Sequence, residues 1–492
     1  MTEFPVHIHS VQQVRAMDRY AIDQLGIPGY TLMTRAGEAA LDDLHKMWPD
    51  ARRILVVCGF GNNAGDGYVL ARLAEASGLE ATVIALADPE KLAGDAARAW
   101  NDFKANGGTA LGWADELLNS ADVIVDAIFG TGLARPLSAD LVAQVNAINN
   151  APCPVFALDV PSGLDADNGA VMGAVVRAQR TITFVGLKQG FYLGEGPNFI
   201  GTLTFAGLGI PAAATDAAGF VSTRLTSLDV HRALPRRRRT AHKGDAGRVL
   251  LVGSNKGMAG AIRMAGEACL RVGAGLVTVA TRTDNVASVV TARPELMCRG
   301  VETAEELDGL IDWATVIGVG PGLGQDEWSR LVFSRVQRAE KPLVVDADAL
   351  NLLAQAPTRR NDWILTPHPG EAARMLEITT ADVQKDRIAA ARALVQRFGG
   401  VVVLKGAGSI VLDVTEPPSI CDKGNPGMAT PGMGDVLTGV TAGIAAQTQS
   451  LFAAARAAVF AHASAGDMAA AGGERGLIAT DLFPHLRACV NL

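Results

Sequence analysis

The segment Thr430-Pro-Gly-Met-Gly-Asp435 places a carboxylate directly behind two glycines, where an apolar helix is predicted to begin. Gly432 and Gly434 would leave backbone N–H groups free to approach an anion, and the helix dipole would favour the negative charge of a phosphoryl group. Asp435 would then lie close enough to accept a proton from a hydroxyl. The pattern suits phosphoryl transfer, but a short Gly-x-Gly turn is weak evidence by itself.

Three further segments in the same half of the chain support this interpretation. They are Gly318-Val-Gly-Pro-Gly-Leu-Gly324, Thr366-Pro-His-Pro-Gly-Glu371 and Leu404-Lys-Gly-Ala-Gly-Ser409. Each follows an apolar run typical of a buried strand, and the carboxyl ends of parallel strands meet at one sheet edge. We therefore expect all three to lie near Asp435. His368 in the second segment either faces a ligand or is an ordinary turn histidine between two prolines.

The first half of the chain has its own set of polar residues. An apolar strand leads into the glycine-rich segment 59–67, and a helix is predicted to begin near Tyr68. The segment lacks the Lys-Ser/Thr ending of a P-loop, so it is not a Walker nucleotide site. Asn62 and Asn63 offer oxygens for a hard cation and amide groups for a ligand. Asp126 and Asp159 each end a strand, and although either could cap a loop, together they favour a binding site.

The elements that must position these residues form two series of apolar strands alternating with helical stretches, which predicts an α/β protein with two doubly wound domains. The first series is Arg53–Cys58, Ala81–Leu86, Val123–Asp126 and Val155–Asp159. The second is Val249–Val252, Leu276–Val279, Val316–Val319, Leu343–Asp346, Trp363–Thr366 and Val401–Leu404.

The length of 492 residues also exceeds what one core usually supports. We place the domains at 1–225 and 226–492, with the transition near residues 225–240, after the alanine-rich stretch Ala212–Ala218. The run Arg236–Arg239 is interpreted as a solvated linker rather than a nucleic-acid patch. Lys243, shortly after it, could reach a ligand phosphate or form a surface salt bridge.

Composition excludes several classes of protein. Hydrophobic residues make up 49% and charged residues 19%, which excludes long disorder, and the net charge of -7 disfavours nucleic-acid binding. The six cysteines form no Cys-x-x-Cys pair, so neither a zinc site nor a disulfide framework is indicated. With no signal peptide or membrane-spanning run predicted, we expect a cytoplasmic protein with no membrane partner.

At this point a family resemblance can be stated. The segments Gly61–Gly67, Asp126–Gly132 and Asp159–Asp165 resemble the NAD(P)H-hydrate epimerase domain, which implies an N-terminal Rossmann-like fold. The second half resembles the ADP- or ATP-dependent NAD(P)H-hydrate dehydratases of the ribokinase-like superfamily. The resemblance covers nearly the whole chain, in the order of the fused bacterial repair enzymes. The sequence departs from the family pattern at Ala64, Pro431 and Ser138-Ala139, and these departures affect loop geometry rather than chemistry.

For the first domain the resemblance implies epimerisation of the R and S hydrates of NADH and NADPH. Asp159 would contact the reacting part and is the candidate for acid–base work. K+ would be held by Asn63, Asp126 and Ser162. The implied hydrate-binding residues are Asn62, Asn63, Ala64, Gly65, Asp66, Gly130, Thr131, Gly132, Leu133, Ala134, Arg135, Pro136 and Asp159.

For the second domain the resemblance implies dehydration of the S hydrate. ADP or ATP with Mg2+ would phosphorylate the ring hydroxyl, with Asp435 as base, and the ring nitrogen would then expel phosphate. Ala261, Gly322, His368 and Asp435 would face the hydrate. Lys405, Gly406, Ala407, Gly408, Ser409 and Gly434 would contact the nucleotide. The resemblance also implies a homo-oligomer.

Two alternatives from other classes stay open at the level of residues. A small-alcohol or vitamin-precursor kinase with an appended ligand-binding domain would share the Gly-Met-Gly-Asp motif, but an epimerase constellation would have no purpose beside it. A nucleotide-sensing or cofactor-binding module would keep the glycine-rich turns and could dispense with Asp159 and Asp435.

Overall fold

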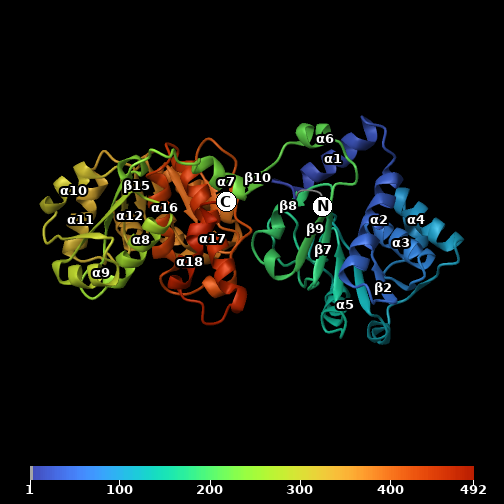
Figure 1. The fold of residues 1–492 in the computed structure, drawn as a ribbon. Helices are drawn as coiled ribbons and strands as arrows, with labels where there is room; N and C mark the ends of the chain where they lie inside the picture. The colour runs from blue at the N-terminus through green and yellow to red at the C-terminus, as the bar shows by residue number, and fades with distance from the viewer. Residues whose placement is uncertain (1–3) are drawn as a thin grey trace. The chain divides into compact units, whose positions relative to one another are not determined.

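The computed structural model describes residues 4–492, which form two compact units that divide between Ser222 and Thr223 (Figure 1). The segment just after the division belongs with the C-terminal unit for two reasons. Strand β10 (Ser222–Arg224) pairs in parallel with β19 (Ser419–Ile420). Helix α7 (Ser227–Ala233) buries Val230 and Ala233 in the C-terminal core.

The N-terminal unit is built on a 7-stranded sheet in which every neighbouring pair is parallel. The strand order is β4 (Ala110–Leu111), β3 (Glu80–Ala85), β2 (Arg53–Cys58), β5 (Val123–Ala127), β6 (Val155–Leu158), β7 (Arg180–Phe184) and β9 (Thr202–Ala206). One face packs against α2 (Gly29–Met47), α3 (Asn62–Ala76) and α4 (Gly94–Ala105), and the other against α5 (Ala139–Asn149). This is the predicted doubly wound arrangement, with each predicted strand present.

Further elements complete this unit. The short strand β1 (His7–His9) pairs in parallel with β8 (Leu187–Lys188). Helix α1 (Val11–Asp23) packs its apolar side, including Val14 and Met17, with Ala214 of α6 (Ala212–Ala218). The alanine-rich stretch before the division is therefore a helix that contributes to a small core.

The prediction that a helix begins near Tyr68 is wrong, because α3 already begins at Asn62. Its glycines do not break the helix; they let neighbouring elements approach it. A Cβ at Gly65 would lie 2.6 Å from the Met33 side chain, and one at Gly67 would lie 2.6 Å from Ala127 Cβ. Asn62 to Gly67 thus occupy the first turns of a helix, not a loop, which fixes the directions of their side chains.

In the C-terminal unit the strand order is β13 (Met297–Gly300), β12 (Leu276–Thr281), β11 (Arg248–Val252), β14 (Val316–Val319), β15 (Leu343–Val345), β16 (Trp363–Leu365), β17 (Val401–Leu404), β18 (Ile410–Leu412) and β19. Pairing is parallel through β17 and antiparallel from β17 to β19. All six predicted strands are present; β14 and β17 have the predicted bounds, and one end of each of the other four shifts by one or two residues. The antiparallel end was not predicted.

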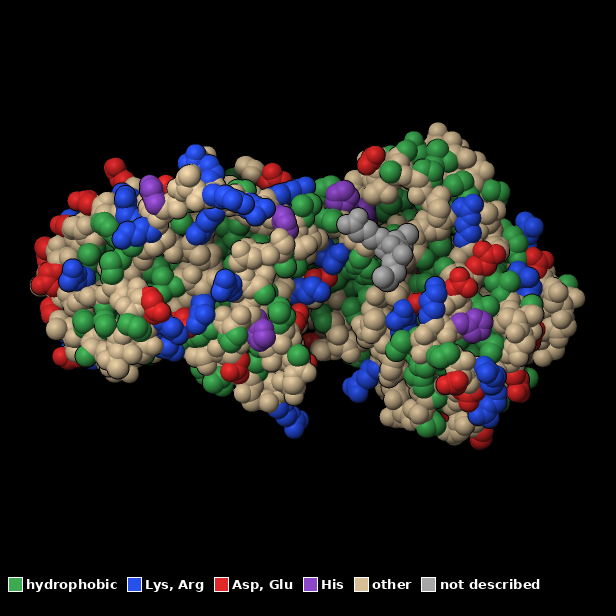
Figure 2. All heavy atoms as spheres, in the orientation of Figure 1, with side chains coloured by type: hydrophobic (Ala, Val, Ile, Leu, Met, Phe, Trp, Pro, Cys, Tyr) green, Lys and Arg blue, Asp and Glu red, His purple; other side chains and the backbone are tan. Residues whose placement is uncertain are grey.

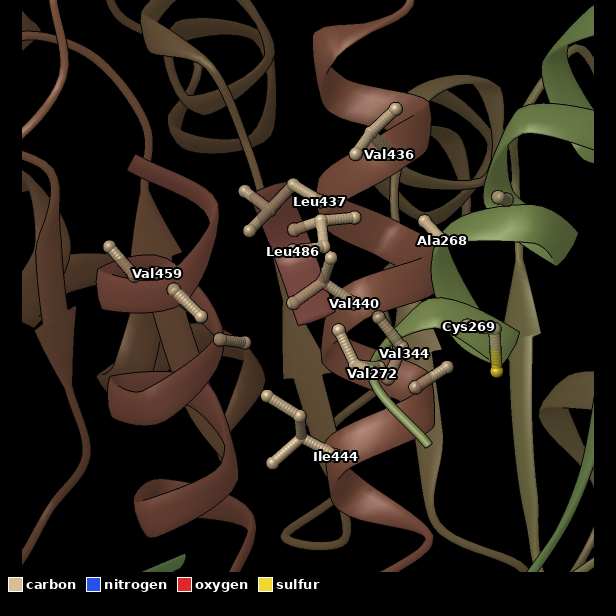
Figure 3. Close-up of a cluster of buried hydrophobic side chains, with 14 of the residues drawn as sticks. Ala268, Cys269, Val272, Val344, Val436, Leu437, Val440, Ile444, Val459 and Leu486 are labelled. Carbon is tan, nitrogen blue, oxygen red and sulfur yellow. The ribbon is translucent and has the colours of Figure 1, made fainter. Parts of the chain in front are cut away.

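The helices of this unit include α8 (Ala259–Arg271), α9 (Val286–Ala292), α10 (Asp308–Trp313), α11 (Glu327–Gln337), α12 (Ala347–Gln355), α13 (Pro369–Leu376), α14 (Thr380–Lys385), α15 (Arg387–Phe398), α16 (Met433–Ala445), α17 (Leu451–Ala469) and α18 (Phe483–Cys489). Figure 3 shows Val436, Val440 and Ile444 of α16 in the buried cluster, with Val459 of α17 and Cys269 of α8. Gly439 permits close contact with α8, because a Cβ there would lie 1.9 Å from the carbonyl oxygen of Ala265. Packing therefore fixes helix α16, and with it the position of Asp435 in the first turn.

Acidic and basic side chains are interspersed over the visible face of each unit (Figure 2). Among the helices of residues 4–492, none combines the length and the hydropathy that a membrane crossing requires.

Candidate active sites

In the C-terminal unit Asp435 lies in the first turn of α16, beside a buried ion pair. The helix is preceded by Gly432 with φ of 91°, which a residue with a side chain rarely adopts. A Cβ at Gly434 would lie 3.5 Å from both Lys405 Nζ and Asp346 Oδ2, and these two side chains are joined by a 2.6 Å contact between Nζ and Oδ1. The structure thus brings together the predicted residues Gly434, Asp435 and Lys405, which come from two distant segments.

The charges around Asp435 suit a proton acceptor. Burial raises the pKa of Asp435 to about 6; the negative charge of Asp346 adds to this and the Lys405 ammonium opposes it. Asp346 also accepts a hydrogen bond of 2.7 Å from Thr438 Oγ1. Burial acts to lower the pKa of Lys405, but the carboxylates of Asp346 and Glu371 outweigh it and leave that pKa raised. Near neutral pH, Asp435 is therefore ionised next to a permanent cation.

His368 is the N-cap residue directly before helix α13 and contacts Glu371 three residues later. The His368 N–H donates to Glu371 Oε2 at 2.8 Å, and His368 Nδ1 accepts from the Gly370 N–H at 3.0 Å. This capping explains why a histidine can occupy the turn, while its other ring nitrogen remains 3.5 Å from Glu371 Oε1. Burial lowers the pKa of His368 and raises that of Glu371 to about 7. Both alternatives for His368 are compatible with this geometry.

The structure places Ala261 and Gly322 side by side. Gly322 has φ of 59°, and a Cβ built on it would lie 3.1 Å from Ala261 Cβ. The same glycine-rich loop is tied to the segment after β15, because the Gly324 N–H donates to Asp348 Oδ2 at 2.9 Å. Since β14 and β15 are neighbouring parallel strands, and Asp346 after β15 lies beside Gly434, this loop and Asp435 border one region at the carboxyl edge of the sheet.

The predicted nucleotide loop Lys405–Ser409 is held from within by a buried arginine. Arg387 donates from Nη2 to the carbonyls of Leu404, Lys405 and Gly408 at 3.3, 3.2 and 3.4 Å. Ser409 Oγ closes the loop by accepting from the Gly406 N–H at 3.2 Å. Gly406 and Ala407 are left exposed, where a ligand can reach their backbone.

In the N-terminal unit a cavity of about 450 Å3 lies at the carboxyl ends of β5 and β6. The predicted residues that line it are Asn62, Asn63, Asp66, Gly130, Thr131, Gly132 and Asp159. Ala64 is instead fully buried in the core, and Gly65 packs against the Met33 side chain. Leu133, Ala134, Arg135 and Pro136 do not line the cavity. Seven predicted hydrate-binding residues therefore line one cavity, and the predicted loop 133–136 does not.

Three oxygen-bearing side chains of the predicted K+ site are buried: Asn63, which lines the cavity, and the hydrogen-bonded pair Asp126 and Ser162. Ser162 Oγ donates to Asp126 Oδ1 at 2.6 Å, and the Ser162 N–H donates to Asp126 Oδ2 at 2.8 Å. Asn63 is 8% exposed, yet within residues 4–492 neither its Oδ1 nor its Nδ2 has a hydrogen-bond partner. A buried amide without a partner is costly, so its oxygen is suited to a bound cation or ligand.

Asp159 lies beside a buried lysine, in a left-handed backbone conformation. Its φ is 64°, a region that aspartate adopts more readily than most residues other than glycine. Lys188 is fully buried, and its Nζ donates to Asp159 Oδ1 at 2.5 Å, to Thr183 Oγ1 at 2.7 Å and to the Phe184 carbonyl at 2.8 Å. Asp159 Oδ2 accepts from the Thr131 N–H at 3.2 Å. The ion pair fixes the carboxylate at the cavity wall.

Sequence reasoning missed Asp346, Arg387 and Lys188. Asp346 directly follows an apolar strand, so the strand-end signal that identified Asp126 and Asp159 also applied to it. Arg387 and Lys188 carry no such signal, because their partners come from other elements. The suggested phosphate contact of Lys243 is not supported, since this residue precedes β11 at the amino end of that strand, away from Asp435.

A larger cavity of about 850 Å3 lies in the C-terminal unit at the amino ends of β14 and β17. It is lined by Val316 and Val401 at the beginnings of those strands, and by no predicted site residue. Because ligands of open α/β sheets bind at the carboxyl ends of the strands, size alone does not make this cavity the active site.

Comparisons with known proteins agree with this geometry. A family described as NAD(P)H-hydrate dehydratase matches residues 249–487, and the YjeF-related protein N-terminus matches residues 29–190. A ribokinase-like superfamily protein from Enterococcus faecalis has a similar structure, with 30% identity, a TM-score of 0.50, and coverage of 55% of this chain and 95% of that one. Thus the C-terminal unit has a ribokinase-like fold.

Two relatives match over almost their whole length. The bifunctional NAD(P)H-hydrate repair enzyme of Coxiella burnetii is 48% identical over 98% of this chain and 99% of its own. The enzyme of the same name from Escherichia coli is 45% identical over 100% of this chain and 96% of its own. Identity of this extent across both units shows that the chain belongs to the family of bifunctional NAD(P)H-hydrate repair enzymes.

Proposed function

We propose that this chain repairs hydrated NADH and NADPH, with epimerisation in the N-terminal unit and nucleotide-dependent dehydration in the C-terminal unit. The observation that carries the proposal is the presence of two separate carboxylate sites, Asp159 with Lys188 and Asp435 with Lys405, each at the carboxyl edge of its own sheet. One unit alone would serve one reaction; two complete sites fit two consecutive ones.

In the dehydratase site, hydroxide is a poor leaving group and phosphate a good one. Asp435 accepts the proton of the ring hydroxyl as that oxygen attacks the terminal phosphoryl group. The ring nitrogen then expels phosphate to form an iminium, and loss of a proton from the adjacent ring carbon to solvent restores the reduced nicotinamide. The backbone N–H groups at the start of α16 and the Lys405 ammonium stabilise the negative charge that is transferred. Ala261 and Gly322, which carry little side chain, leave room for the hydrate.

Mg2+ would enter this site with ADP or ATP. Asp346 and Glu371 are the carboxylates nearest to Lys405, and one or two carboxylates together with phosphate oxygens are a usual donor set for this ion. Within residues 4–492 no cluster of three or more acidic, histidine or cysteine side chains could hold a metal unaided, which agrees with a metal that arrives with the nucleotide.

In the epimerase site, K+ would be held by Asn63, Asp126 and Ser162. The donor set is mainly neutral oxygen with one carboxylate, and the unpartnered amide of Asn63 is the observation that fits a missing ligand. The ion would fix the turn after β5, whose Phe129 N–H donates to Ser162 Oγ at 2.8 Å. Asp159 would then face the hydrate from a cavity wall whose shape is fixed by that turn.

One experiment tests the whole proposal. Purified chain is mixed with prepared hydrate, Mg2+, K+ and either ADP or ATP, and the absorbance of reduced nicotinamide is followed. Recovery of NADH or NADPH, with release of phosphate, supports the proposal. Accumulation of a stable phosphorylated product would instead support a small-alcohol kinase. A homo-oligomer and a cytoplasmic location remain predictions, which light scattering and cell fractionation can test.

A further inference from the structure

The cavity of the N-terminal unit contains more carboxyl groups than Asp159 alone. The titratable side chains around it are Arg15 and Asp18 from α1, Asp66 from α3, Asp95 from α4 and Asp159 beyond β6, with Lys188 buried beneath. Asp159 is engaged by Lys188 and the Thr131 N–H. Within residues 4–492, by contrast, neither Asp18 nor Asp66 takes part in any hydrogen bond or salt bridge, so both carboxyls are free to meet a ligand.

Helix α1 is anchored so that it holds Asp18 at the cavity. Arg15, one turn before Asp18, donates to the Thr131 carbonyl at 2.9 Å, and Thr131 is part of the cavity wall. The start of the helix is fixed by a 2.7 Å hydrogen bond from the Val11 N–H to Asp167 Oδ1. Met17, the residue before Asp18, is fully buried on the apolar side of the helix. The position of Asp18 is therefore set by contacts on three sides.

Burial and neighbouring negative charges favour the protonated form of both carboxyls. Burial raises the pKa of Asp18 to about 6; the charge of Asp159 adds to this, and Lys188 opposes it. Burial also raises the pKa of Asp66 well above its ordinary value, and the negative charges of Asp159 and Asp18 add to this effect. Both carboxyls line the same cavity, and the charge of Asp18 acts on the titration of Asp66. Asp95, the remaining acidic residue, lies against Gly29 at the start of α2.

We propose that Asp18 and Asp66 are the general-acid pair of the epimerase, giving a proton to the hydroxyl that leaves the reacting ring carbon, while Asp159 at the sheet edge accepts the proton of the water that returns. This inference rests on the proposed epimerase function. It gives Asp66 a chemical role beyond binding, and it adds Asp18, which lies outside the glycine-rich segments of the first domain.

The exchange balances as follows. The carbon–oxygen bond breaks as the ring nitrogen lone pair forms a carbon–nitrogen double bond, and the proton of the Asp18–Asp66 pair converts the departing hydroxide into water. Water then adds to the other face of the same carbon, the double-bond electrons return to nitrogen, and the released proton passes to the Asp159 carboxylate. The reverse direction uses the same groups in opposite roles, and solvent re-equilibrates the protons between turnovers.

The test measures interconversion of the R and S hydrates by the full-length chain without ADP or ATP, starting from one epimer and resolving both by chromatography. The variants are Asp18→Asn and Asp66→Asn, with Asp18→Glu as a rescue. Asp23→Asn is the matched control, because Asp23 is an exposed residue of the same helix. Hydrate binding is measured by calorimetry, and kcat and KM are determined separately across the pH range.

We expect Asp18→Asn to lower kcat by about 100-fold, in the range of a lost general acid, with hydrate affinity nearly unchanged. The unaltered chain should lose activity as rising pH removes the last proton of the pair, and the variant should lack this limb of the profile. Asp18→Glu should recover part of kcat, Asp66→Asn should lower kcat like Asp18→Asn, and Asp23→Asn should match the unaltered chain.

Three results would overturn the inference. They are normal kcat in Asp18→Asn, an unchanged pH profile, and a loss of kcat that is matched by an equal loss of hydrate binding, which would show a structural role. Failure of the unaltered chain to interconvert the epimers would overturn the proposed epimerase function itself, and this inference with it. Dehydration of the pure S hydrate should be the same in every variant, since it uses the other unit.

Discussion

Replacing Asp435 with asparagine should separate nucleotide binding from dehydration. The side chain lies in the first turn of α16, whose buried packing against α8 and α17 does not involve the carboxylate, so the fold should be unaffected. Asparagine keeps the shape and cannot accept the hydroxyl proton. We expect turnover to fall by about 100-fold or more, which corresponds to about 2.7 kcal/mol in activation free energy. Affinity for ADP or ATP should be unchanged or higher, because a negative charge near the phosphates is lost.

The pH dependence gives an independent check of the same role. Because Asp435 must be deprotonated to act as a base and burial raises its pKa to about 6, dehydratase turnover should fall as pH decreases through about 6. The assay follows the absorbance of reduced nicotinamide from pure S hydrate at saturating nucleotide. Asp312→Asn, at an exposed position of α10, is the control and should behave like the unaltered chain. Near-normal turnover in Asp435→Asn, or the same acid limb in that variant, would refute the reasoning.

Three further predictions concern the N-terminal unit. Epimerisation should increase with KCl, and Asp126→Ala should weaken that response because the carboxylate of the predicted K+ site is lost; an equal response of variant and unaltered chain in a salt titration would contradict this. Asp159→Asn should repair the S epimer quickly and leave the R epimer to slow spontaneous inversion, whereas the unaltered chain should repair a mixture completely; chromatography of the remaining hydrate decides. Gly130→Ala should weaken hydrate binding in calorimetry with little change in melting temperature, because the added methyl would lie 2.7 Å from Asp159 Oδ2, inside the cavity; unchanged affinity would mean that the hydrate does not occupy this space.

The amino-acid sequence by itself determined the architecture and indicated the sheet edge at which each candidate site lies. The apolar runs predicted the strands that lead to Asp126 and Asp159, and also the strands that precede the loops near Asp435. They could do so because a strand buried on both faces must be apolar throughout. The glycine-rich segments after those strands identified the correct sheet edge, since short turns and ligand approach both require residues without side chains.

Only the tertiary structure decided which charged groups surround those residues. The pairing of Lys188 with Asp159, the contact of Arg387 with the loop at Lys405 and the approach of Asp18 to the cavity each join residues from different elements. No local pattern records such pairs, because an interaction between distant segments depends on how helices and strands pack and not on the residues adjacent in sequence. The start of α3 at Asn62 was missed for the same reason. The glycines of its first turns allow close packing of Met33 and Ala127, but in the sequence alone a glycine-rich segment indicates a loop.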